Sequence, residues 1–277
     1  MKGLLPALGA IVLWSTLASL GVALVHVPPL LLTGLALVIG SVPAWPLLRR
    51  WRVPASTLLL GVYGLFGFHF LLFVALRHAP PLEANLVNYL WPLLIVVLAP
   101  VVLPGLTLRP LHVAAASVGF AGAALAITGG REIGTGLPWG YLPAFGSAVV
   151  WATYSLLTRR VRAFPTAAVG LFGLVSGLLA LACHAAFEPS ATLSPHDWAL
   201  VAVTGLGPLG AAFFLWDAAL KRGDPRRIGI LSYLTPLLST LLLALTSGRP
   251  LGPATALAAV LIAGAAVVGV RARAGAE

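Results

Sequence analysis

Polar side chains interrupt several long apolar stretches of this sequence, and their spacing places them on shared helix faces. In the stretch that begins near residue 82, Asn85, Asn88 or Tyr89, and Pro92 recur at the i, i+3/4, i+7 spacing of one helical face. Polar groups are costly in hydrocarbon, so such a face is expected to point into a bundle interior or a wet cavity. We expect this face to line a substrate cavity, with hydrogen bonding between helices as the alternative.

A second stretch repeats the pattern with Ser232, Tyr233 and Pro236. A proline within a span frees a carbonyl of the preceding turn, which a substrate or water can use. Pro92 and Pro236 are therefore the predicted hinges or kinks, and Tyr233 joins the candidate substrate-binding residues.

Tryptophan and other polar aromatic residues occur far from the ends of two further stretches, which contain Trp14, Ser15, Trp151, Tyr154 and Ser155. Trp and Tyr often anchor a helix at the membrane interface. Trp14 and Trp151 lie near the middle of their stretches, which argues against that role. We expect these residues to line the cavity, with core packing as the alternative.

His69 and Trp91 complete the candidate binding set. An imidazole in hydrocarbon needs a partner, so His69 contacts either the substrate or a structural hydrogen-bond acceptor. The nearby Phe66, Phe70 and Phe73 form a stripe of a kind that is more often core than ligand site.

The acidic residues argue against catalysis and against a proton relay. Of the seven carboxylates, only Glu83 and Asp217 fall at membrane depth, and Asp217 lies four residues before Lys221, the spacing of a helical ion pair. The sequence lacks an HExxH motif and paired acids, so no metal, cofactor or enzymatic activity is expected. We expect transport that is not obligately driven by protons.

The composition is that of a polytopic membrane protein. The chain is 60% hydrophobic and 9% charged, with a mean hydropathy of +1.01, whereas soluble domains carry about 25% charged residues. The net charge of +10 would suit nucleic acid, but the charges form short clusters between apolar segments. The lipid bilayer, and not nucleic acid, is the expected partner.

The apolar segments predict an all-α protein with ten transmembrane helices, because a spanning helix needs about 20 apolar residues. The expected spans are 3–24, 28–48, 53–76, 82–104, 109–128, 139–158, 165–187, 197–220, 226–247 and 251–270.

Lysine and arginine predict the orientation. With the N-terminus inside, 14 of these residues fall on inner segments and 3 (Arg77, Arg131 and Arg249) on outer loops. Inner loops of membrane proteins are enriched in these residues, so both termini are expected to be cytoplasmic.

The chain contains an internal duplication. Gly61–Leu94 aligns with Gly205–Leu238 without a gap at an offset of 144. Five spans per copy makes the second copy, 139–273, enter inverted relative to the first, 1–128. Inverted repeats around a central cavity are typical of alternating-access transporters. Positions where the copies differ, such as His69 against Phe213 and Phe73 against Asp217, are where we expect the substrate to be selected.

Small residues at Ala115, Gly119 and Ala123 allow close helix contact within the bundle or between copies. The sequence is therefore compatible with a monomer or a weak homodimer.

Several of these segments resemble the drug/metabolite transporter superfamily in its ten-span, EamA-type form, and within it the bacterial exporters of aromatic amino acids. The segments are Ala10–Thr16 (AIVLWST), Val87–Leu93 (VNYLWPL), Trp151–Ser155 (WATYS) and Ser232–Ser239 (SYLTPLLS), with Trp216 upstream of the last. The resemblance implies an inner-membrane exporter of aromatic and related amphipathic amino acids. The rival expectation is a multidrug or other small-metabolite exporter of the same fold. The small multidrug members rely on a carboxylate in their first span, which this chain lacks.

Overall fold

The computed structural model describes residues 2–132, 134, 136–247 and 251–271, and over these residues the chain consists of helices and loops without strands. The first half contains α1 (Leu4–Ser15), α2 (Leu17–Ala23), α3 (Pro29–Ser41), α4 (Ala55–Val62), α5 (Phe68–His78), α6 (Pro81–Asn88), α7 (Trp91–Val102) and α8 (Pro110–Thr128). The second half contains α9 (Tyr141–Leu157), α10 (Val169–Phe187), α11 (Pro195–Leu206), α12 (Ala212–Arg222), α13 (Pro225–Leu231), α14 (Leu234–Ser247) and α15 (Pro253–Arg271). Shorter segments are the 3-10 helices η1 (Val42–Trp51) and η3 (Thr166–Ala168) and the π segments η2 (Tyr63–Gly67) and η4 (Gly207–Ala211).

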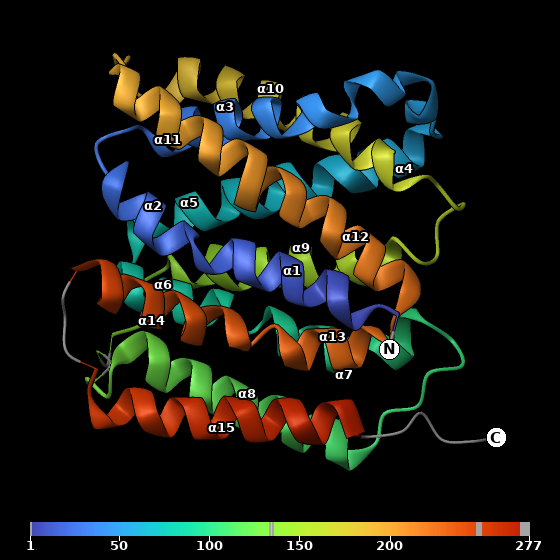
Figure 1. Cartoon of the computed structure of the whole chain (residues 1–277), viewed down its shortest axis with the longest axis vertical. Coiled ribbons are helices and arrows are strands. Elements are labelled where there is room, and N and C mark those ends of the chain that lie inside the picture. The colour runs from blue at the N-terminus through green and yellow to red at the C-terminus, as the bar shows by residue number, and fades with distance from the viewer. Residues whose placement is uncertain (1, 133, 135, 248–250, 272–277) are drawn as a thin grey trace.

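Eight continuous helical runs in the described chain are long and apolar enough to cross a membrane. They are Leu4–Ala23, Pro29–Trp51, Ala55–His78, Pro81–Val102, Pro110–Thr128, Thr166–Phe187, Pro195–Arg222 and Pro225–Thr246. The other two expected spans correspond to α9, which has 17 residues, and to α15, whose apolar part is Pro253–Gly269. Both lie beside the other helices in one bundle (Figure 1).

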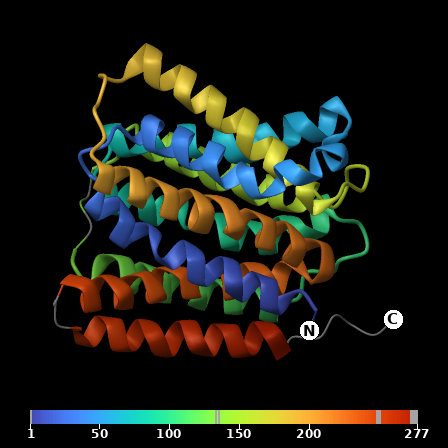
Figure 2. The same cartoon turned by 45° about the horizontal axis from the view of Figure 1, so that its top comes forward.

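Two closely packed helix pairs form opposite edges of the bundle: α3 with α10, and α8 with α15 (Figures 1 and 2). Glycines allow the first pair to approach. A Cβ on Gly34 would lie 3.0 Å from the Gly177 carbonyl oxygen, and a Cβ on Gly177 would lie 2.8 Å from the Gly34 carbonyl oxygen. Small residues therefore bring the two backbones into contact, as is common between membrane helices.

Three of the helical runs are interrupted near their middle. α1 gives way to α2 at Thr16, α6 to α7 at Tyr89 and Leu90, and α13 to α14 at Ser232 and Tyr233. Pro92 and Pro236 each lie just after an interruption, in the first turn of the helix that follows. A proline is tolerated in a first helical turn because an N–H at that position has no acceptor within the helix, so its absence costs no hydrogen bond.

Two π segments interrupt the runs α4–α5 and α11–α12. A π segment changes the hydrogen-bond register of a helix and is frequent at functional sites. Both segments face the middle of the bundle: Gly64 in η2 packs against the Tyr154 ring, and the carbonyl of Pro208 in η4 accepts a bond from Trp14.

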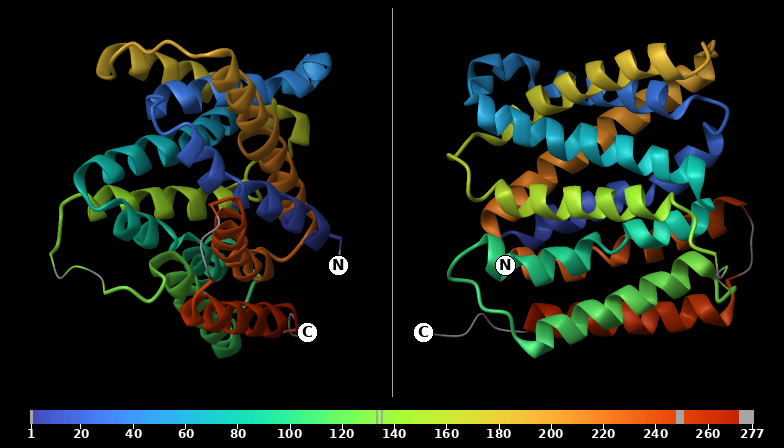
Figure 3. Two further views of the ribbon diagram at one scale, coloured as in Figure 1. Left: turned by 60° about the vertical axis from the view of Figure 1, so that its left-hand side comes forward. Right: turned by 180° about the vertical axis from the view of Figure 1, so that it is seen from behind.

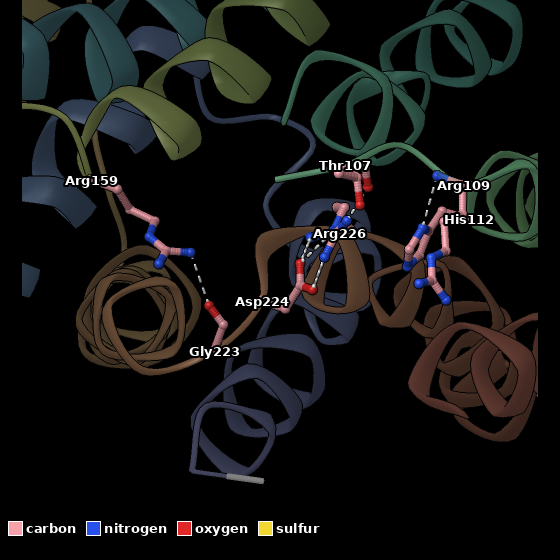
Figure 4. Close-up of polar contacts among 7 residues, drawn as sticks. All are labelled: Thr107, Arg109, His112, Arg159, Gly223, Asp224 and Arg226. Carbon is pink, nitrogen blue, oxygen red and sulfur yellow. Dashed lines mark hydrogen bonds and ion pairs between the residues drawn. The ribbon is translucent and has the colours of Figure 1, made fainter. Parts of the chain in front are cut away.

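The bundle has two distinguishable ends. α1 begins and α15 ends at the same end, as Figure 1 shows, and the views in Figure 3 agree. We call this the basic end, because the loops and helix termini there contain Arg109, Arg159 and Arg226 (Figure 4). α5 and α10 end at the opposite end, where α3 begins.

Candidate functional site: an aromatic cluster where the halves meet

Four tryptophans and one phenylalanine pack together in the middle of the bundle. This aromatic cluster consists of Trp14 (α1), Trp91 (α7), Trp151 (α9), Phe213 and Trp216 (both α12), and each side chain is buried. Ring centroids lie 5.2 Å apart for Trp14 and Trp216, 5.6 Å for Trp91 and Trp216, and 5.7 Å for Trp151 and Phe213. Edge-to-face and offset contacts of this kind add to the stability that burial alone gives.

Two of the indole N–H groups are satisfied inside the bundle. Trp14 Nε1 donates to the Pro208 carbonyl at 3.0 Å, and Trp216 Nε1 donates to Ser155 Oγ at 3.1 Å. A buried indole usually needs such an acceptor. The π segment η4 supplies the first acceptor and Ser155 the second, so these bonds fix the ring orientations.

His69 extends the cluster along α5. Its ring contacts Phe213 at a centroid distance of 6.1 Å, and Phe68 beside it contacts Trp151 at 5.3 Å. His69 Nδ1 lies 2.6 Å from the Leu65 carbonyl, a backbone group of the preceding turn. The imidazole thus has the structural partner that the sequence required, and its ring also faces the aromatic cluster.

Asn88 and Tyr154 lie next to this group of rings. Asn88 is buried and its Oδ1 accepts a hydrogen bond from Ser147 Oγ at 2.8 Å, which joins α6 to α9. The Tyr154 ring lies next to that of Trp151, tilted by 42°, with centroids 5.4 Å apart. Asn88 lies three residues before Trp91 on its helical run, and Tyr154 lies three residues after Trp151 on α9.

The remaining candidates are arranged differently. Ser15 is buried, but its hydroxyl donates to Val12 O of its own helix. Asn85 and Tyr89 are half-buried on the run that leads to Trp91. Tyr233 is fully buried against Phe120 of α8, in a separate hydrophobic group. The structure thus brings Trp14, Trp91, Trp151, Tyr154 and Ser155 together and leaves Tyr233 apart.

Three residues of this centre were absent from the predicted set: Phe68, Phe213 and Trp216. The repeat gave a signal for Phe213 and for Trp216. Phe213 aligns with His69, a candidate residue of the first copy. Trp216 replaces Leu72 of the first copy, and a tryptophan that appears in one copy only is the kind of asymmetry that points to a specific contact.

The rings of the cluster fill the space between the helices. A cavity of about 320 Å³ lies instead at the end of the bundle opposite the basic end. Phe73, one of the positions expected to select the substrate, lines this cavity, whereas the residues expected to bind the substrate do not. The centre is therefore packed in this structure, and room for a small molecule is found between the ends of α3, α5 and α10.

Side-chain contacts to backbone carbonyls tie the basic end together (Figure 4). Arg226 is buried, is paired with Asp224 at 2.6 Å and donates to the Thr107 carbonyl, while Arg159 donates to the Gly223 carbonyl at 3.1 Å. Burial opposes ionisation of Asp224, but the hydrogen bonds and charge of Arg226 outweigh it and lower the pKa of that carboxyl. The Arg226 contact with Thr107 joins the second half to the first, and the Arg159 contact with Gly223 joins two segments of the second half.

Asp217, a buried carboxylate, belongs to the same end. Its Oδ2 accepts from Lys221 Nζ at 2.6 Å, as the i,i+4 spacing predicted, and from Thr166 Oγ1 at 2.6 Å. Lys221 also donates to the Phe164 carbonyl at 2.8 Å and lies over the Phe164 ring. These bonds join α12 to the segment 164–166.

An all-helical bundle with broken helices at its middle and an aromatic centre is typical of polytopic membrane transporters. The sequence profile of the EamA-like transporter family matches residues 1–128 and again 138–270. The chain therefore belongs to the EamA-like transporter family.

Named relatives agree with this assignment. The chain is 44% identical over 271 residues to the aromatic amino acid exporter YddG of Ancylobacter novellus, covering 94% of this chain and 93% of that protein. Proteins of the same name from Salmonella typhimurium and Escherichia coli K12 are 28% and 26% identical, each over 90% of both chains. A crystal structure at 44% identity superposes with a TM-score of 0.90 and covers 96% of this chain and 95% of its own. These proteins are transporters and not enzymes, so the chain is a multi-pass membrane transport protein.

Proposed function

We propose that this protein exports aromatic and related amphipathic amino acids across the bacterial inner membrane by alternating access. The observation that carries the proposal is the aromatic cluster, which lies where helices of both halves meet. Indole and phenyl side chains suit an aromatic guest because they offer stacking surfaces and N–H donors. The names of the relatives, which specify aromatic amino acids, support the same substrate class.

Pairs of equivalent residues support an inverted duplication. Trp14 and Trp151 align in the two halves and contact each other at 5.7 Å, and so do His69 and Phe213 at 6.1 Å. A residue contacts its own equivalent only near a two-fold axis. The π segments η2 and η4 are also separated by the repeat offset of 144. We therefore propose that the protein has ten spans in two inverted five-helix repeats.

The charge distribution supports cytoplasmic termini. The basic end carries the clusters that the positive-inside rule assigns to the cytoplasm, and α1 begins there. A reporter fused to the C-terminal end is expected to be active only on the cytoplasmic side. Activity on the outer side would overturn the orientation.

Counterflow in proteoliposomes tests the substrate. Vesicles loaded with unlabelled tryptophan are expected to take up labelled tryptophan and phenylalanine through the protein. Movement of a cationic dye without movement of either amino acid would overturn the proposal and favour a multidrug exporter of the same fold.

A further inference from the structure

The cavity opposite the basic end has the size and lining of a binding site. Its volume is about 320 Å³, at the small end of the range of ligand pockets. Its walls come from the start of α3 and the ends of α5 and α10, and they include Leu30, Phe70, Phe73, Arg77, Phe187 and Glu188. We call it the Arg77 cavity. It combines phenyl rings with one exposed cation.

The charges of the cavity are not equivalent. The Glu188 side chain is 0% exposed, whereas that of Arg77 is 49% exposed. Glu188 Oε1 accepts from Leu30 N at 3.1 Å and from Arg77 at 3.2 Å, and its Oε2 accepts from Leu31 N at 3.3 Å and His184 Nδ1 at 3.0 Å. The carboxylate is therefore fully engaged with protein donors.

Arg77 keeps donors available. Among the described residues its guanidinium has Glu188 as its hydrogen-bond partner, through Nη2. A guanidinium has five N–H donors in a planar fork that fits a carboxylate. The pair with Glu188 holds the side chain at the cavity wall, and the remaining N–H groups can face a ligand.

We propose that the Arg77 cavity is a substrate subsite in which Arg77 binds the carboxylate of an aromatic amino acid and Phe70 and Phe73 contact its ring. The inference rests on the proposed function and adds a second position on the transport route, toward the outer side. It assigns to Arg77 the recognition of charge that the aromatic cluster, which contains no cation, does not provide.

One face of α5 connects this subsite to the aromatic cluster. His69, Phe73 and Arg77 follow each other at intervals of four residues and so share a helix face. The His69 ring lies 6.3 Å from that of Phe73, which lines the cavity, and 6.1 Å from that of Phe213 in the cluster. The aromatic ring of a substrate that leaves the cluster would thus contact aromatic side chains on its way to Arg77.

The equivalent position at the basic end is closed. The repeat aligns Arg77 with Lys221 and Phe73 with Asp217. Lys221 is held by Asp217 at 2.6 Å and lies 3.8 Å from the centre of the Phe164 ring. A cation thus occurs at both ends of the route, and in this structure the one on α5 borders a cavity.

Competition in tryptophan counterflow tests the subsite. Indole-3-propionate and tryptamine share the indole ring, but only the first has a carboxylate. In the wild type, indole-3-propionate is expected to compete at least as well as tryptamine. In Arg77→Gln, the concentration of indole-3-propionate that halves counterflow is expected to rise about tenfold, the effect of losing a charge-assisted hydrogen bond, while that of tryptamine stays unchanged.

Two further variants and the wild-type counterflow separate the possible outcomes. Arg77→Lys keeps the charge but not the fork, so a smaller rise confined to indole-3-propionate is expected, and this variant serves if Arg77→Gln does not fold. Arg131→Gln, at another arginine of the expected outer loops, should change neither value. Equal shifts for both competitors, or none, in the Arg77 variants would overturn the subsite. Absence of tryptophan and phenylalanine counterflow in the wild type would instead overturn the proposed function.

Discussion

Trp14 and Trp151 meet edge to face, with ring centroids 5.7 Å apart and an interplanar angle of 77°. They lie on α1 and α9, the first helix of each half, and the local sequences around them align. The contact places the junction of the halves within an aromatic group. Any relative movement of α1 and α9 would therefore rearrange these rings, which links the packing of the centre to transport.

Removing the Trp151 ring is expected to damage both folding and transport. The ring contacts Trp14, Phe213 and Trp216, so Trp151→Ala should cost about 3–5 kcal/mol of stability. Trp151→Phe should keep the fold and reduce tryptophan counterflow. Thermal unfolding in detergent and counterflow measure the two effects. Trp139→Ala, at an exposed ring, is the control, and unchanged counterflow in both Trp151 variants would contradict a role in transport.

The apolar segments predicted the helices well because burial of the backbone in lipid leaves few alternatives. The expected span 139–158 corresponds to α9, Tyr141–Leu157, and the expected span 109–128 corresponds to α8, Pro110–Thr128. The interruption at Thr16 was not foreseen, because no proline or glycine marks it. It depends on tertiary contacts that a local pattern does not contain.

The candidate site was predicted in part. Mid-span position identified Trp14 and Trp151, since a tryptophan far from the interface needs another reason for its place. Helical spacing placed Tyr233 among the candidates, but its ring packs on α8 near Gly119, where a missing side chain makes room. Helical periodicity gives the face of one helix and not the neighbour that this face meets.

The hydrogen bond between Trp216 and Ser155 should be measurable. Ser155→Ala leaves a buried indole N–H without its acceptor and is expected to cost about 1–3 kcal/mol. Ser15→Ala is the matched control, because that hydroxyl bonds within its own helix, so its loss should cost less. The double variant Ser155→Ala with Trp216→Phe should lose less than the sum of the two single effects. Additive losses in thermal unfolding would argue against the bond.

The pair of Asp224 and Arg226 predicts a pH dependence of stability. The pKa of Asp224 is lowered in the folded protein, so its contribution is present above the unfolded pKa of about 4 and is lost as the pH falls through the folded value. Asp224→Asn should therefore lower stability by about 1–3 kcal/mol at pH 7, with a smaller difference at the lowest pH that the protein tolerates. Glu132→Gln, at an exposed acid, should show no such dependence. A difference that grows on acidification would contradict the prediction.

Asp217 tests whether transport requires a proton. Its carboxylate is buried and paired with Lys221 and Thr166, an arrangement that serves to hold the basic end and does not need to release a proton during transport. Asp217→Asn keeps the shape and one acceptor oxygen, so it should retain counterflow, and a protonophore should leave the downhill flux of the wild type intact. Lys221→Gln leaves the buried Asp217 carboxylate without its cation and should lower the free energy of unfolding by about 3–5 kcal/mol. It should therefore be the less stable of the two variants. Loss of flux in folded Asp217→Asn, or block of downhill flux by the protonophore, would count against transport that is not driven by protons.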